Sequence, residues 1–225
     1  PAHSRAHFLR ELADGVSYVW HFRPARALLL LTAWISLVAL PYNTLTPIFA
    51  REILGGGART LGFLNSGVGL GALAGALYLA ARPSVAGLGS VVAFACATFG
   101  AGLCAFALSR NYALSLLIMP VIGVGVLMQL ASTNTLMQTI ADDRHRGRMI
   151  SLYTTAMMGL VPFGCLADGA LAQAIGAPLT LLISGALCLA AALVYYLRLP
   201  SFRAELDAAH AYLTAPPVLP NGPRC

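Results

Sequence analysis

Apolar residues dominate six stretches of the chain, and polar or turn-forming residues separate them. The stretches cover roughly residues 26–50, 60–81, 85–108, 111–140, 147–174 and 177–199. About 20 mostly apolar residues form a helix long enough to cross a bilayer. Glycine and proline mark the joints, as at 55–57, Pro83 and Pro178. The pattern therefore predicts six transmembrane helices over residues 26–199.

The segments on either side of these stretches have a different character. In residues 6–22, Phe8 and Leu12 share one helical face while the charged residues lie elsewhere, which is typical of an amphipathic helix lying on a membrane surface. We therefore expect residues 1–25 to form a cytoplasmic amphipathic linker. Residues 200–225 contain five prolines, which predicts a disordered cytoplasmic tail.

Composition agrees with a chain embedded in a membrane. Of the 225 residues, 58% are hydrophobic and 10% are charged, with a mean hydropathy of +0.76, whereas soluble domains carry about 25% charged residues. On a soluble protein the net charge of +6 would suggest nucleic acid as a partner. Here the basic residues lie between apolar stretches, so the expected partner is the lipid bilayer and not nucleic acid.

The distribution of arginine predicts the orientation. With the N-terminus in the cytoplasm, eleven arginines fall on the inner side and three, Arg51, Arg59 and Arg110, on the outer side. Membrane proteins keep an excess of positive charge on the cytoplasmic side. We therefore expect both termini in the cytoplasm, in a multi-pass protein of the cell membrane.

Polar side chains are concentrated on three of the six predicted spans. At about 100° per residue they cluster on one face of each helix. The residues are Thr32, Ser36, Asn43 and Thr46 in the first span, Gln129, Ser132 and Thr133 in the fourth, and Thr154, Met157, Gly164 and Asp168 in the fifth, with Tyr153 at the edge of that face. Such groups either hold helices together, at about 0.6–2 kcal/mol each, or line a path for a small-molecule substrate. Because the third and sixth spans have the small apolar composition expected of lipid-facing helices, we interpret the three polar faces as a substrate path.

Asp168 is an ionisable side chain inside an apolar stretch. A charged side chain near the centre of a bilayer costs about 2.5–3.5 kcal/mol, so such residues usually have a function. Proton coupling or binding of a cationic group would explain its presence. Alternatively, Asp168 lies close enough to the predicted outer turn to be solvated.

A short repeat connects the second and fifth spans. Residues 71–77 read GALAGAL and residues 164–171 read GCLADGAL, with Asp168 as the one additional residue. Equivalent segments three spans apart imply a second copy that is inverted in the membrane, which is typical of secondary transporters. The predicted fold is an all-α integral membrane protein with six transmembrane helices arranged as a 3+3 inverted repeat.

Four segments resemble a known transporter family. They are FLRELADGVSYVW (8–20), TPIFAREILGGG (46–57), LGFLNSGVGLGALAGAL (61–77) and DDRHRGRMISLYTTAMMGLVPFGCLADGALA (142–172). They are similar to the C-terminal half of major facilitator superfamily transporters of the enterobactin-exporter and macrolide-efflux type. The resemblance implies a fold of two rocking six-helix halves, in which this chain supplies the second half and an N-terminal half, fused or separate, supplies the first.

The resemblance also implies a cytoplasmic gate. Asp143, Arg146 and Arg148 match the family's pattern after the fourth span of this half, and they are candidate ion pairs of that gate. Alternatively, the two arginines only fix the orientation of the chain. The family's best-known cytoplasmic motif belongs to the other half, and its counterpart here, at 80–84, keeps Arg82 without an acidic partner.

The function we expect is secondary active transport, with proton-driven export of small amphipathic molecules, drug-like or siderophore-like by resemblance. An intramembrane enzyme is disfavoured because the five histidines lie outside the spans or at their edges and Asp168 has no second intramembrane acid. The five cysteines form no CxxC pair, so the sequence indicates neither a metal site nor a cofactor. The alternative is a truncated or split half-transporter without activity of its own, suggested by Pro1 in place of an initiating methionine.

Overall fold

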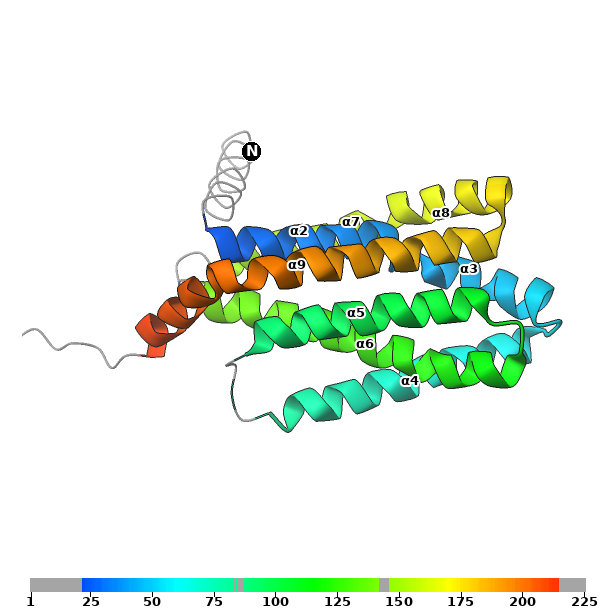
Figure 1. Ribbon diagram of the computed structural model, residues 1–225, viewed down its shortest axis with the longest axis horizontal. Coiled ribbons are helices and arrows are strands. Elements are labelled where there is room, and N and C mark those ends of the chain that lie inside the picture. Colours follow the sequence, from blue (N-terminus) through cyan, green and yellow to red (C-terminus); the bar gives the residue numbers. More distant parts are fainter. Residues whose placement is uncertain (1–21, 83, 85–86, 142–145, 215–225) are drawn as a thin grey trace, which may run out of the picture.

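The computed structural model describes residues 22–82, 84, 87–141 and 146–214, with side chains up to residue 201. These residues form helices that run along one common direction (Figure 1), with no strand among them. In chain order they are α2 (Arg23–Val38), α3 (Tyr42–Ile48), the π-helix η1 (Phe49–Ile53), α4 (Ala58–Ala80), α5 (Leu88–Leu108), α6 (Tyr112–Ile140), α7 (Arg146–Gly159), α8 (Val161–Ile175) and α9 (Ala177–Thr214). They provide six spans long and apolar enough to cross a membrane, as the sequence predicts.

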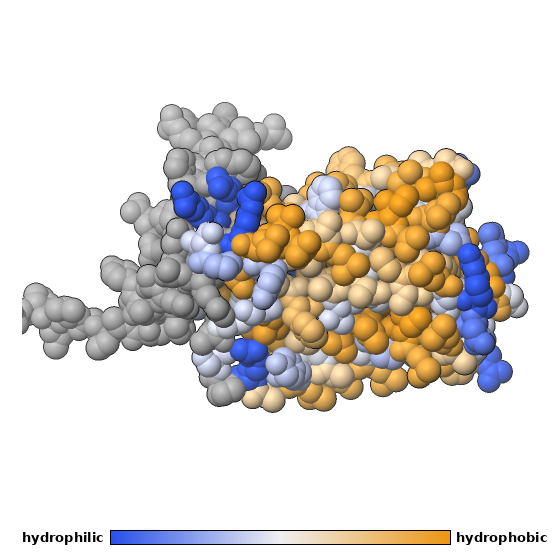
Figure 2. All heavy atoms as spheres, in the orientation of Figure 1, coloured by the Kyte–Doolittle hydropathy of each residue, from blue (hydrophilic) through white to orange (hydrophobic). Residues whose placement is uncertain are grey.

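Figure 2 shows an apolar belt between two hydrophilic ends on the face that it draws. Leu70, Leu117 and Leu166 are between 66% and 73% exposed. Contiguous apolar surface of this kind is unfavourable in water, whereas lipid tails solvate it and the helices satisfy their own backbone groups. The chain is a multi-pass membrane protein.

Prolines interrupt two of the six spans. In the first span α2 ends at Val38 and α3 begins after Pro41, because proline has no N–H to continue the helical hydrogen bonds. The sequence predicts one continuous fifth helix over 147–174, but the structure divides it at Leu160 into α7 and α8. Pro162 lies in the first turn of α8, where its fixed φ angle and missing N–H are tolerated best.

The last helix is longer than the sequence predicts. The tail was expected to begin at residue 200, but α9 continues through Pro200 to Thr214. Residues 201–214 contain several alanines, leucines and glutamate, which favour helix, while four of the five prolines follow later. The disordered tail is therefore a wrong expectation for 200–214. The remaining tail and residues 6–21 of the amphipathic segment lie outside the described residues.

Helix packing confirms the 3+3 inverted repeat. α4 packs against α6, and its counterpart α7–α8 packs against α2 and α3. Likewise α5 packs against α6, its counterpart α9 packs against α2, and α5 and α9 pack against each other. Exchanging each span with the one three positions away converts these contacts into one another, whereas the contact between α8 and α9 has no comparable counterpart between α4 and α5.

The contact between α5 and α9 explains the small apolar residues of the third and sixth spans. Sγ of Cys96 lies 3.7 Å from Sγ of Cys188, and a Cβ on Gly100 would lie 2.9 Å from the carbonyl oxygen of Gly185. The sequence interprets these spans as lipid-facing, yet α5 has the largest buried share of the six spans. Small residues allow two helix backbones to approach closely, so here the composition reflects helix packing.

Candidate functional site

A group of buried polar side chains lies on α2 and α6. Ser36 of α2 and Gln129, Ser132 and Thr133 of α6 are all inaccessible to solvent in this structure. Nε2 of Gln129 donates a hydrogen bond to Oγ1 of Thr133 at 3.3 Å. The hydroxyl oxygens of Ser36 and Ser132 and Oε1 of Gln129 are buried without a hydrogen-bond partner in the described structure. Since buried polar groups are normally paired, these three oxygens retain the capacity to bind water or a polar group of a substrate.

The two other candidates in the first span have different environments. Thr46 is buried, and its hydroxyl donates to the carbonyl of Tyr42 at 2.9 Å. This bond within the helix uses the donor that Thr46 could offer to a substrate. Asn43 is exposed on the surface of α3. In α3, therefore, Thr46 faces the interior of the bundle and Asn43 faces outwards.

The candidates on α7 separate in the same way. Thr154 is exposed, whereas Met157 is half-buried and packs against the apolar core. The exposed surface of α6 and α7 also carries polar residues that the helical-face analysis does not select, namely Thr135, Gln138, Ser151 and Thr155. Their signal in the sequence is the run STNT at 132–135 and the adjacent threonines at 154–155, which are polar all round the helix.

Tyr153 connects α7 to α6. Its side chain is 4% exposed, and its hydroxyl donates to the carbonyl of Leu130 at 3.0 Å. The bond crosses between two helices and involves a backbone acceptor, so Tyr153 positions α7 beside the buried polar residues of α6.

Replacing Tyr153 with phenylalanine is expected to lower the free energy of unfolding by about 1 kcal/mol, because one buried interhelical hydrogen bond is lost. Thermal unfolding of the purified protein in detergent, followed by circular dichroism, would measure the change. Tyr196→Phe is the matched control, since Tyr196 is 59% exposed. Equal unfolding temperatures for both variants would contradict the assigned bond.

Asp168 is buried between α8 and α9. Its side chain is 4% exposed, and the hydroxyl of Ser184 on α9 is its polar neighbour. Oδ2 has no hydrogen-bond partner in the described structure. The burial goes against the alternative that this carboxyl is solvated at the outer surface, although the end of α8 is only about 10 Å away at 1.5 Å per residue.

Helices packed against α8 bring little charge to the level of Asp168. α8 contacts α2, α3, α7 and α9. Up to residue 201, the charged residues of α2, α7 and α9 are Arg23, Arg26, Arg146, Arg148 and Arg198, which lie towards the opposite end of the bundle from Ile175. Asp168 is therefore a buried carboxyl with the hydroxyl of Ser184 beside it and none of these arginines at its level.

The structure does not place Asp168 on one continuous face with Thr154. The division at Leu160 interrupts the helix between them. Thr154 is exposed on α7, while Asp168 points into the contact between α8 and α9. The single polar face predicted for the fifth span is therefore wrong, because it assumes an unbroken helix.

The candidate gate residues lie where α6 meets α7. Nε of Arg146 donates to the carbonyl of Gln138 at 3.3 Å, so Arg146 binds one of the last carbonyls of α6, as cations at helix C-termini do. Arg148 is half-buried. Asp143, the acid with which they would form ion pairs, lies outside the described residues.

Comparison with known proteins places this geometry in a family. A family model described as transmembrane secretion effector, of the major facilitator superfamily type, matches residues 2–220. The comparison with curated proteins gives no match. The six apolar spans and the inverted contact pattern agree with this family, whose description points to transport rather than catalysis. Because the match covers nearly its whole length, the chain belongs to the transmembrane secretion effector family of major facilitator transporters.

Proposed function

We propose that the chain acts as the C-terminal half of a proton-driven exporter of small amphipathic molecules that works by alternating access. The observation that carries the proposal is Asp168, a carboxyl that is 4% exposed and has one oxygen without a partner. Ionisable groups inside membrane spans are costly, and proton relays in transporters are one of their recurring uses. Drug-like or siderophore-like cargo is proposed from the sequence resemblance to enterobactin and macrolide exporters.

Asp168 is proposed to bind one proton per cycle. Gain or loss of that proton changes the charge between α8 and α9 by one unit, in surroundings where Ser184 is the described polar neighbour. A proton taken up from the outer side and released to the cytoplasm would make inward proton movement drive outward cargo movement. For this to work, the two conformations must differ in the free energy of the charged carboxylate.

The cargo path is proposed to lie on the side of α6 and α7. Thr135, Gln138 and Thr154 are exposed polar residues on this side. Thr135 and Gln138 donate within α6, to the carbonyl of Ala131 and to Oδ1 of Asn134, and lipid would offer no partner to the polar groups that remain. An N-terminal six-helix half covering this surface would leave a polar-lined cavity, into which the buried oxygens of Ser36 and Ser132 could open when the halves rock. This need for a covering half also favours the second candidate, a half-transporter that is inactive by itself.

The proposed orientation has both termini in the cytoplasm of a cell-membrane protein. Among the described residues, Arg51, Arg59 and Arg110 lie at one end of the bundle. Arginines are more numerous at the opposite end, where Arg23, Arg26, Arg82, Arg146, Arg148 and Arg198 lie. The excess of positive charge assigns that end to the cytoplasm.

A transport assay tests the proposal. The chain would be expressed with and without an N-terminal six-helix half, and efflux of a panel of fluorescent dyes from energised cells would be measured. We expect efflux only when both halves are present, and we expect an uncoupler to abolish it. Efflux that survives the uncoupler would contradict proton coupling. If the protein with both halves is correctly inserted but transports nothing, the result would support the second candidate, an inactive half-transporter.

Replacing Arg146 and Arg148 together with glutamine is expected to slow the inward–outward switch and to lower the maximal efflux rate several-fold. The reason is the proposed loss of charged contacts at the cytoplasmic end, including the Arg146 bond to the Gln138 carbonyl. Initial rates at saturating dye would measure the effect, with Arg110→Gln at the other end as control. Normal turnover in the double variant would leave both arginines with a role in orientation only.

A further inference from the structure

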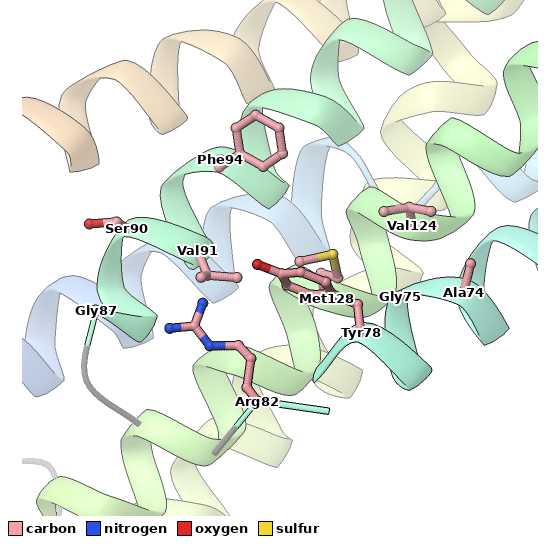
Figure 3. A pocket seen from close by; sticks show the side chains of 10 residues that line it. All are labelled: Ala74, Gly75, Tyr78, Arg82, Gly87, Ser90, Val91, Phe94, Val124 and Met128. Carbon is pink, nitrogen blue, oxygen red and sulfur yellow. The ribbon is translucent and has the colours of Figure 1, made fainter. Parts of the chain in front are cut away.

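A second cavity lies away from the proposed path, where α4, α5 and α6 meet at the arginine-rich end. It has a volume of about 600 Å³. Figure 3 shows its lining, in which Arg82 and Tyr78 extend from the end of α4 towards Ser90 and Val91 on α5. Met128 of α6 lies behind them. None of the residues proposed for cargo or proton binding lines this cavity.

The walls of the cavity are apolar and its polar groups are gathered at one end. Ala74, Val91, Phe94, Val124 and Met128 form the apolar part. At the floor of the cavity Gly75 packs closely against Met128, since a Cβ on Gly75 would lie 3.1 Å from Cγ of Met128. The lining therefore suits a molecule with a long apolar portion, in a protein whose surroundings are lipid.

The polar end of the cavity contains a cationic side chain. Its lining contains a guanidinium, that of Arg82, and no acidic side chain. A guanidinium nitrogen of Arg82 lies 3.9 Å from the position that a Cβ on Gly87 would occupy. Gly87 precedes α5 with a φ of 74° and provides no side-chain cap for the first N–H groups of that helix. These amides carry partial positive charge, so the helix start and Arg82 both favour an anion.

We propose that this cavity binds an anionic membrane phospholipid, with its phosphate at Arg82 and the start of α5 and an acyl chain along Val91 and Phe94. Arginine binds phosphate with two parallel hydrogen bonds, and basic pockets between membrane helices bind acidic head groups. The cavity lies at the end assigned to the cytoplasm, within reach of the inner leaflet. Such a lipid would hold the ends of α4 and α5 together beside α6.

Lipid retention by the full 225-residue chain tests the proposal. The protein would be purified in detergent, mixed with palmitoyl-oleoyl phosphatidylglycerol or the phosphatidylcholine of the same chains, and studied by native mass spectrometry. We expect phosphatidylglycerol to be retained preferentially. Arg82→Gln is expected to lower its apparent affinity about tenfold, since a hydrogen bond to a charged group is lost. Arg82→Lys, which keeps the charge, should retain part of the binding.

Two further variants separate this cavity from general attraction to basic protein surfaces. Ala74→Phe, at an exposed position in the lining, should block the cavity and lower phosphatidylglycerol binding without changing any charge. Arg198→Gln removes an arginine from the groove between α2 and α9 at the same end and should leave binding unchanged. Thermal unfolding of each variant would verify that it is folded.

Three outcomes would overturn the proposal. Unchanged phosphatidylglycerol binding in folded Arg82→Gln and Ala74→Phe variants would remove the cavity as the site. An equal loss in Arg198→Gln would mean general electrostatic attraction. Complete displacement of the lipid by inorganic phosphate alone would identify a site for soluble phosphate anions. None of these results depends on whether the chain transports anything.

Discussion

Replacing Gly71 or Gly164 with alanine is expected to lower the free energy of unfolding of the bundle by about 3 kcal/mol, at the upper end for overpacked sites. A Cβ on Gly71 would overlap the backbone carbonyl of Pro120 on α6, and a Cβ on Gly164 would overlap the carbonyl of Leu37 on α2. Backbone atoms cannot move aside as a flexible side chain can, so α4 and α8 would have to shift. Unfolding in mixed detergent and SDS micelles, followed by circular dichroism, would measure the loss.

The same two helices provide matched controls. Gly69 on α4 and Gly169 on α8 have open space where a Cβ would be. Alanine at these positions is expected to be neutral or to stabilise by up to about 1 kcal/mol, because alanine favours helix over glycine. If Gly71→Ala were as stable as Gly69→Ala, the close contact between α4 and α6 would be contradicted.

These two glycines relate the repeat in the sequence to the repeat in the structure. Gly71 contacts α6 at Pro120, and Gly164 contacts the first span at Leu37 and Pro41. In each case the second helix of one copy packs against a proline-containing first helix of the other copy. The alignment of GALAGAL with GCLADGAL therefore predicts a real equivalence of contacts.

The structure corrects one detail of that alignment. The sequence treats Asp168 as an inserted residue and pairs Gly75 with Gly169. Yet Gly75 and Asp168 are both buried four residues after the contact glycine, while Gly169 meets open space. Asp168 therefore occupies the place that Gly75 occupies in the other copy. One copy uses this place for close packing, and the other holds a carboxyl there.

Helix number and repeat could be predicted from the sequence because they depend on properties that each segment has alone. A run of about 20 apolar residues crosses a bilayer whatever its neighbours are. The positions where helices break or end are harder to predict, because the same residue type has different outcomes. Pro162 lies in the first turn of a new helix, whereas Pro120 and Pro200 lie inside continuous helices. Proline predicts a lost hydrogen bond, but packing and local helix propensity decide whether the helix stops.

The candidate site could be predicted only in part, for a geometric reason. Spacing gives the angle between two side chains only along an unbroken helix. Ser36 and Asn43 are predicted on one face, but α2 ends at Val38 and α3 begins at Tyr42, so Ser36 is buried while Asn43 is exposed. Spacing also does not tell which side of a helix faces its neighbours, so it does not distinguish buried Ser132 from exposed Thr154. Asp168 was identified more easily, since a carboxyl in an apolar stretch is conspicuous in any orientation.

Replacing Asp168 with asparagine is expected to reduce uncoupler-sensitive efflux by the complete transporter to the level of de-energised cells. Asparagine has nearly the same shape and can still form a hydrogen bond with Ser184, but it cannot gain or lose a proton. Insertion and unfolding temperature should therefore stay close to those of the parent protein. Dye efflux after re-energising loaded cells would measure the loss, and thermal unfolding in detergent would verify the fold.

Glu52→Gln is the matched control for this change, because it makes the same carboxyl-to-amide replacement at an exposed position in η1. It should leave energised efflux unchanged, since a solvated carboxylate there has no part in the proposed proton step. If Asp168→Asn also transported normally and remained sensitive to the uncoupler, Asp168 would have no role in coupling. Its burial beside Ser184 would then serve the packing of α8 against α9, and the proton would have to bind elsewhere in the complete transporter.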